Sequence, residues 1–238
     1  MGTNETVPKS LSRCKRCGTC CKKGGPVLHR EDKSLLNGGP IKYEQLISIR
    51  KGEMAFLPLH DEPEPTAQEL VKISGKGKNW ECTFFNRQKN SCAIYDHRPL
   101  ECRLLQCWET SALEAIVGHN TLARVDIITR DNPVMEFIQH HELECPVPGP
   151  DKLHIALSSE PEGLEALAEL TELVRKDLAI RADAVMRFNI PLSLELFLFG
   201  RPLHTILNVY GLSVIENDGH IQITPRQASR FISARTAR

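Results

Sequence analysis

Cysteine is absent from the last 93 residues of this 238-residue chain, and all nine cysteines lie within the first 145. Long apolar runs are also absent: no stretch approaches the roughly 20 apolar residues of a transmembrane helix, which excludes a helical membrane protein. Residues 1–12 contain no apolar run, so we expect no secretory signal peptide and a cytoplasmic location. The hydrophobic fraction of 41% nevertheless suffices for a folded core and excludes a disordered chain.

Familiar catalytic motifs are lacking as well. The chain has no Walker loop, no GxGxxG and no GxSxG. The segment His141-Glu-Leu-Glu-Cys145 lacks the second histidine of a zinc-protease helix. The sequence therefore leaves open whether the protein is an enzyme, and its cysteines are the residues that indicate function best.

The cysteines are grouped in a way that favours metal binding. Their odd number and the absence of an export signal argue against a disulfide framework. Clustered thiols in a reducing compartment are first of all metal ligands, with a redox dithiol or inert buried thiols as the alternatives. The candidate metal ligands are Cys14, Cys17, Cys20, Cys21, Cys82, Cys92, Cys102, Cys107 and Cys145.

The first group has the spacing Cys14-x-x-Cys17-x-x-Cys20-Cys21. Two residues between cysteines let the backbone turn so that both sulfurs face one metal ion. The adjacent pair at the end suits a polynuclear centre or two separate ions better than a single tetrahedral ion, because neighbouring side chains diverge.

The second group has the spacing Cys82-x9-Cys92-x9-Cys102-x4-Cys107, and Cys145 stands alone as the third. A hairpin predicted over residues 80–96 would bring Cys82 near Cys92. Cys145 precedes a proline, as does the last ligand of some iron–sulfur runs. Three histidines lie close to cysteines, and we expect them to be exposed loop residues rather than ligands: His97, His140 and His141.

The whole pattern has two halves. The first is C-x-x-C-G-x-C-C over residues 14–21, and the second is Cys82-Thr-Phe84 followed by Cys92-Ala-Ile-Tyr95-Asp-His-Arg98-Pro99-Leu-Glu-Cys102-Arg103. This pattern resembles the YkgJ-like cysteine-cluster family, also called the CxxCxxCC zinc- or iron-chelating domain, over about residues 11–150. The resemblance implies a set of ligands rather than a reaction. Some flagellin lysine methylases are similar to the same domain, which implies an iron–sulfur alternative to zinc.

The residues leave the metal open. Zinc prefers well separated C-x-x-C pairs, whereas regularly spaced cysteines favour an iron–sulfur cluster, so iron–sulfur, zinc and iron are all candidates, in one or two centres. Basic residues between Lys9 and Arg30 are placed to stabilise thiolates, and the lack of aromatic residues among them argues against nucleic-acid binding. Tyr95, Arg98 and Arg103 are expected to support the ligands rather than to catalyse, Arg98 by bonding a thiolate or a carbonyl group.

The chain divides at the proline-rich segment that ends at Pro150. We expect residues 1–150 to form a small, irregular, cysteine-rich metal-binding domain, with a helix over 42–51 and a strand over 122–129. Residues 151–238 are predicted to be mainly helical, with a long amphipathic helix that Pro191 ends and two shorter helical runs after it. A terminal β-hairpin around Asp218-Gly219 and a basic tail are expected to follow. The predicted fold class is α+β.

Three functional hypotheses follow. The first is an intracellular metal-binding protein with a structural or electron-transfer role. The second is an enzyme, a cluster-dependent protein methyltransferase. The third is a zinc-stabilised interaction module that holds a protein partner through residues 151–238. None of the three involves a membrane.

Overall fold

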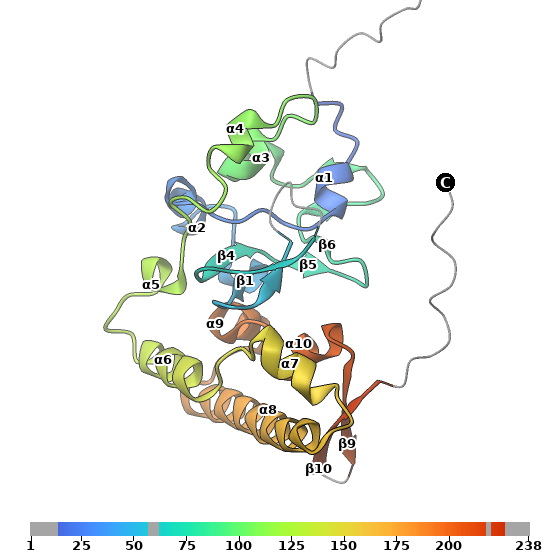
Figure 1. Ribbon diagram of the computed structural model, residues 1–238. Coiled ribbons are helices and arrows are strands. Elements are labelled where there is room, and N and C mark those ends of the chain that lie inside the picture. The colour runs from blue at the N-terminus through green and yellow to red at the C-terminus, as the bar shows by residue number, and fades with distance from the viewer. Residues whose placement is uncertain (1–13, 57–61, 218–219, 227–238) are drawn as a thin grey trace, which may run out of the picture.

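The structure is a computed structural model that describes residues 14–56, 62–217 and 220–226 (Figure 1). It combines helices with small antiparallel sheets, which confirms the α+β class. The α-helices are α1 (Thr19–Lys22), α2 (Lys33–Leu36), α3 (Leu100–Leu104), α4 (Ser111–Glu114), α5 (Arg124–Ile127), α6 (Val134–Glu144), α7 (Pro150–Ala156), α8 (Pro161–Phe188), α9 (Glu195–Phe199) and α10 (Leu203–Val209). Short 3₁₀ turns are η1 (Arg30–Asp32), η2 (Tyr43–Gln45), η3 (Tyr95–His97) and η4 (Leu192–Leu194). The strands pair as β1 (Leu46–Ile49) with β4 (Leu70–Ile73), β2 (Met54–Ala55) with β3 (Glu64–Pro65), β5 (Gly75–Lys76) with β6 (Glu81–Cys82), β7 (Phe85–Asn86) with β8 (Ser91–Cys92), and β9 (Leu212–Asn217) with β10 (His220–Pro225).

The N-terminal half, blue to green at the top of Figure 1, is built around β1 and β4. Leu46 lies opposite Ile73, and Ile49 lies opposite Leu70. The edge of β4 is extended by backbone hydrogen bonds from two distant segments, in which the Leu28 N–H donates to Val71 and the Val71 N–H donates to the carbonyl of Leu122. Long-range pairing of this kind gives the loops that carry the cysteines a common support.

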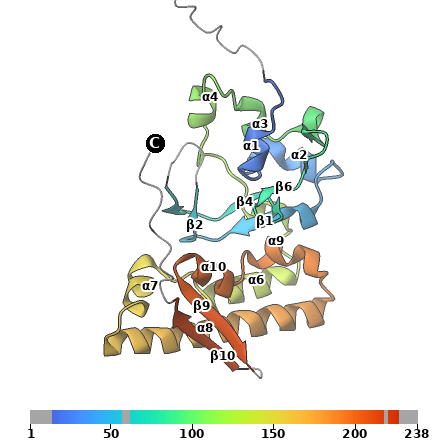
Figure 2. The same cartoon turned by 90° about the vertical axis from the view of Figure 1, so that its right-hand side faces the viewer.

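The C-terminal half is helical, and α8 runs along its base (Figure 2). The buried residues of α8 recur at helical spacing and pack against α6, α7 and β10. The helix ends as predicted, because Asn189 takes a left-handed conformation with φ 50° and Pro191 follows. The predicted terminal hairpin is present as β9 and β10. Its turn at residues 218–219 and the basic tail at 227–238 lie outside the described residues.

Two predicted elements are wrong. Residues 46–49 form strand β1, because all four are buried and pair with β4, and only Tyr43–Gln45 of the expected helix makes a 3₁₀ turn. Residues 124–127 form helix α5 instead of a strand. There the Asp126 carboxylate accepts a hydrogen bond from the Ala123 N–H at 3.0 Å, which closes the first helical turn.

The two halves share a hydrophobic core. Helix α9 packs on β1, and Phe197 and Phe199 are buried in the same cluster as Leu46 and Ile73. The Ser48 hydroxyl donates to the Phe197 carbonyl at 2.5 Å. The predicted boundary near residue 150 stays a prediction, although contacts cross it. None of the helices in the described ranges is long and apolar enough to cross a membrane.

Candidate metal centre

Eight of the nine candidate ligands lie in the upper part of the molecule, around α1, β6 and α3 (Figure 1). All nine cysteines are free thiols. Helix α1 packs against β6, which brings the first cysteine group onto the second. The eight are Cys14 and Cys17 before α1, Cys20 and Cys21 on α1, Cys82 on β6, Cys92 on β8, Cys102 on α3 and Cys107 after α3.

The hairpin of the second group is shorter than predicted. Strands β7 and β8 pair Phe85 with Cys92, whereas Cys82 lies opposite Gly75 in the neighbouring pair β5–β6. Burial and the nearby Cys92 thiol both raise the pKa of Cys82. The two thiols are therefore within electrostatic range, although they are not partners across one hairpin.

Gly18 allows the first cysteine group to approach the second. Its φ is +76°, and a Cβ at this position would lie 2.6 Å from the Phe85 ring and 2.7 Å from the Asn90 amide oxygen. No real side chain tolerates such contacts, so only glycine lets α1 begin here. The glycine in the C-x-x-C-G-x-C-C pattern therefore has a packing reason.

The ring of Tyr95 contacts one arginine from each of the two cysteine-bearing segments. The guanidinium carbon of Arg16 lies 4.0 Å from the centre of the Tyr95 ring, and that of Arg98 lies 3.8 Å from it. Arg98 also donates to the carbonyl groups of Tyr95 and Cys102, at 2.8 and 3.4 Å. These contacts hold the loop of residues 14–17 against the segment that leads to α3.

Two buried carboxylates that the sequence analysis did not single out fix α3. Glu101 accepts from the Val27 N–H at 2.9 Å, and Asp32 accepts from the Leu100 N–H at 2.8 Å. Both side chains are nearly inaccessible to solvent, at 8% and 0% exposure. Arg103 lies 3.9 Å from Asp32, so it reaches this carboxylate. The sequence offers one signal for a role of Glu101, which is its position inside the Pro-x-x-Cys motif that ends at Cys102.

The thiols of α1 differ in acidity. The Cys21 thiol donates a hydrogen bond to Cys20, which lowers the pKa of Cys20 to about 6, with a further lowering from Arg98. The same hydrogen bond, together with burial and the Cys20, Cys82 and Cys92 thiols, raises the pKa of Cys21. Cys20 is thus the thiol of this pair that ionises first.

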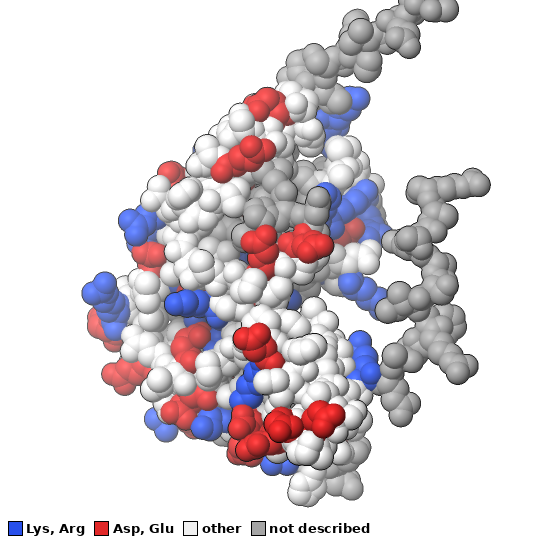
Figure 3. Space-filling view, viewed as in Figure 1, with Lys and Arg blue, Asp and Glu red and all other residues white. Residues whose placement is uncertain are grey.

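The donor set fits zinc or iron in chemistry, while its side chains are not closed around a point. Within residues 14–56, 62–217 and 220–226, no three Cys, His, Asp or Glu side chains converge closely enough to hold a metal ion. Thiols are nevertheless the donors that zinc and iron–sulfur clusters prefer, and the elements around α1, β6 and α3 carry eight of them. Figure 3 shows blue side chains over the region of α1, where Lys15, Arg16, Lys22 and Lys23 are exposed and can offset thiolate charge.

Cys145 lies away from the other eight. It is fully buried in a second hydrophobic cluster with Leu153 and Leu170, and burial raises its pKa to about 11. His141, expected in an exposed loop, is instead buried on α6, where its Nε2 lies 2.6 Å from Asp177. His97 is exposed in the turn η3, as expected, whereas His140 is exposed but lies on α6 and not in a loop.

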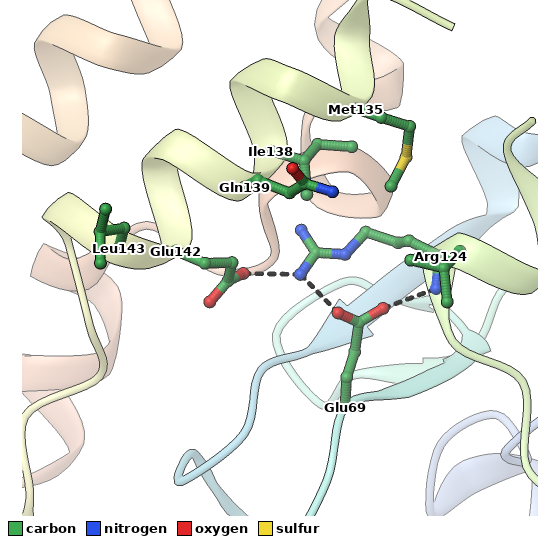
Figure 4. Close-up of a pocket in the computed structure, with 8 residues that line it drawn as sticks. Glu69, Arg124, Met135, Ile138, Gln139, Glu142 and Leu143 are labelled. Carbon is green, nitrogen blue, oxygen red and sulfur yellow. Dashed lines mark hydrogen bonds and ion pairs between the residues drawn. The ribbon is translucent and has the colours of Figure 1, made fainter. Parts of the chain in front are cut away.

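A surface pocket of about 420 Å³ lies in the lower half, beside α6 (Figure 4). Arg124 pairs there with Glu69 and with Glu142, at 2.6 Å to each. The carboxylates of Glu69 and Glu142 thus share the one guanidinium of Arg124, and Met135 and Ile138 belong to the remaining wall. None of the residues that line the pocket is a cysteine. It lies apart from the cysteine-bearing elements.

Residues 13–120 match the family model CxxCxxCC, described as a "Putative zinc- or iron-chelating domain". This confirms the resemblance for the segment that carries the eight grouped cysteines, whereas Cys145 lies beyond the matched residues. No curated protein and no solved structure matches the chain.

Proposed function

We propose that the protein binds zinc or iron through the eight cysteines between residues 14 and 107, and that Cys145 is a core residue instead of a ligand. One observation carries the proposal: three separate segments, within the part matched by a zinc- or iron-chelating family, bring eight free thiols to the same region. Bound zinc would supply a structural cross-link, and a bound iron–sulfur cluster would supply electron transfer.

The surroundings of the thiols support this function. The exposed lysines and arginines near α1 stabilise thiolate. The hydrogen bond from Cys21 is the main cause that lowers the pKa of Cys20, and the charge of Arg98 lowers it further. Glu101 and Asp32 hold α3, which carries Cys102, through two backbone N–H groups. These residues orient ligands and do not themselves offer a reaction.

Of the two metals we favour iron, as an iron–sulfur cluster, because three cysteines at regular spacing are followed at once by a fourth. Free thiols in this number also need a reducing compartment, so the proposal places the protein in the cytoplasm.

Purification without oxygen tests the proposal. The visible spectrum, the metal content and the acid-labile sulfide are measured on the same sample. Visible absorption with iron and sulfide in matching amounts supports an iron–sulfur protein, and zinc without colour or sulfide supports the zinc form. A protein that contains neither metal, and takes up neither when reconstituted, would refute metal binding.

A further inference from the structure

Solvent exposure divides the eight cysteines into two sets of four. Four are exposed, and the other four are buried or half-buried. The exposed four, here named the outer set, are Cys14, Cys17, Cys20 and Cys107. The remaining four, here named the inner set, are Cys21, Cys82, Cys92 and Cys102. One tetrahedral zinc ion or one [4Fe–4S] cluster takes four thiolates, so each set matches the need of one centre.

Packing against the core identifies the inner set independently. Cys82 belongs to the main hydrophobic cluster, and Cys21 and Cys92 pack against that cluster. Cys102 follows Glu101, whose buried carboxylate holds α3 in place. Burial, and then the Cys82 thiol, raise the pKa of Cys102. The inner thiols therefore share one environment at the edge of the core.

The outer thiols are exposed to solvent and influence one another electrostatically. Burial is the largest cause that raises the pKa of Cys107, and the Cys20, Cys17 and Cys14 thiols raise it further. The Arg16 N–H donates to Cys14 Sγ at 3.4 Å, and Thr19 Oγ1 lies 3.2 Å from Cys17 Sγ. The hydrogen bond with Thr19 lowers the pKa of Cys17.

Cys20 and Cys21 lie where the two sets meet. Successive residues of an α-helix point about 100° apart, so the adjacent cysteines on α1 face different sides of the helix. Cys21 packs on the core, whereas Cys20 faces solvent. Cys20 also raises the pKa of Cys82 and of Cys102, after burial, which places the two sets side by side.

We infer that the eight cysteines form two adjacent metal centres, an inner centre held by the inner set and an outer centre held by the outer set. The inference rests on the proposed function. It adds the number of centres, their ligands and the order in which a chelator removes the two metals. Because the outer set is exposed, a chelator removes the outer metal first, and the inner metal stays until the core opens.

Three variants test the assignment on protein purified without oxygen: Cys107→Ser, Cys92→Ser and Cys145→Ser. Metal per chain should fall to half in the first two and stay unchanged in the third. In Cys107→Ser the remaining metal should resist the chelator EDTA, and in Cys92→Ser it should be released quickly. Metal content that is equal to wild type in Cys107→Ser and Cys92→Ser, or absent from both folded variants, overturns the two-centre arrangement.

A measurement on the wild-type protein covers the case in which Cys92→Ser does not fold. Brief treatment with EDTA is followed by alkylation and mass spectrometry. Alkylation confined to the four outer cysteines, with half of the metal retained, supports the inference, and simultaneous labelling of both sets overturns it. A single centre would refute only this inference, whereas a wild-type protein without any metal would refute the proposed function as well.

Discussion

At the scale of the residue, a few side chains decide whether the cysteine segments meet. Gly18 gives the closest approach, because its missing Cβ leaves room for the Phe85 ring. Tyr95, whose ring contacts both Arg16 and Arg98, links the loop before α1 to the segment before α3. The motif therefore contains residues whose contacts hold the ligand-bearing segments together.

Gly18→Ala should lower the free energy of unfolding by about 2–4 kcal/mol, because it adds a steric clash to the strain of a positive φ. The matched control is Gly38→Ala, where φ is +73° and no atom lies within 4 Å of the new Cβ. The control should lose only about 1 kcal/mol. Urea denaturation of both variants measures the difference, and equal losses would contradict the packing role of Gly18.

Tyr95→Leu should lower the free energy of unfolding by about 1–2 kcal/mol and speed tryptic cleavage after Arg16, because both guanidinium contacts are lost. Tyr95→Phe keeps an aromatic face and should retain most of the stability. Denaturation and timed proteolysis of the two variants provide the comparison. The stacking explanation fails if phenylalanine is as damaging as leucine.

At the scale of the element, α6 and α8 are joined by a buried polar pair. His141 on α6 bonds to Asp177 on α8, and Asp177 also accepts from Arg181 at 2.9 Å and from the Leu203 N–H at 3.0 Å. Burial lowers the pKa of His141 despite the hydrogen bond to Asp177. The folded state therefore disfavours the protonated imidazole, and the tie between the helices depends on pH.

The sign of this dependence follows from the lowered pKa of His141. Its contribution to stability is present above the ordinary value near 6.5 and is lost as pH falls, because the unfolded chain binds the proton more readily. When the pH falls from 7.5 to 5.5, the free energy of unfolding of the wild type should decrease by up to about 1 kcal/mol more than that of His141→Gln. Urea denaturation at both pH values measures this difference. A variant with the same pH dependence as the wild type would show that His141 does not titrate in this window.

At the scale of the whole molecule, charged and apolar contacts join the cysteine-rich half to the helical half. Arg50, at the end of β1, donates to Glu142 on α6 at 2.9 Å and also to the Cys145 carbonyl. Arg124 bonds to Glu69 and Glu142 (Figure 4). Phe197 and Phe199 complete the core over β1. These contacts make the C-terminal helices part of the support for the cysteine segments.

A fragment of residues 1–150 should therefore lack a cooperative unfolding transition, even with metal present. It loses the buried aromatic side chains of α9, each worth about 3–5 kcal/mol in a core. Circular dichroism during heating, with the full chain as the control, measures this. A sharp transition in the fragment would instead establish the predicted boundary at residue 150 as a true domain boundary.

The sequence by itself determined the local features: the spacing of the cysteines, the amphipathic pattern of α8, the stop at Pro191 and the terminal hairpin, because each depends on residues close together in the chain. The predictions of a helix over 42–51 and a strand over 122–129 were wrong. In the first segment pairing with β4 outweighed local preference, and in the second a helical turn closed by Asp126 did so. Tertiary structure alone decided which cysteines lie together, that Cys145 and His141 belong to other parts of the core, and that Glu101 and Asp32 hold α3. Those outcomes rest on contacts between residues far apart in sequence, for which spacing carries no information.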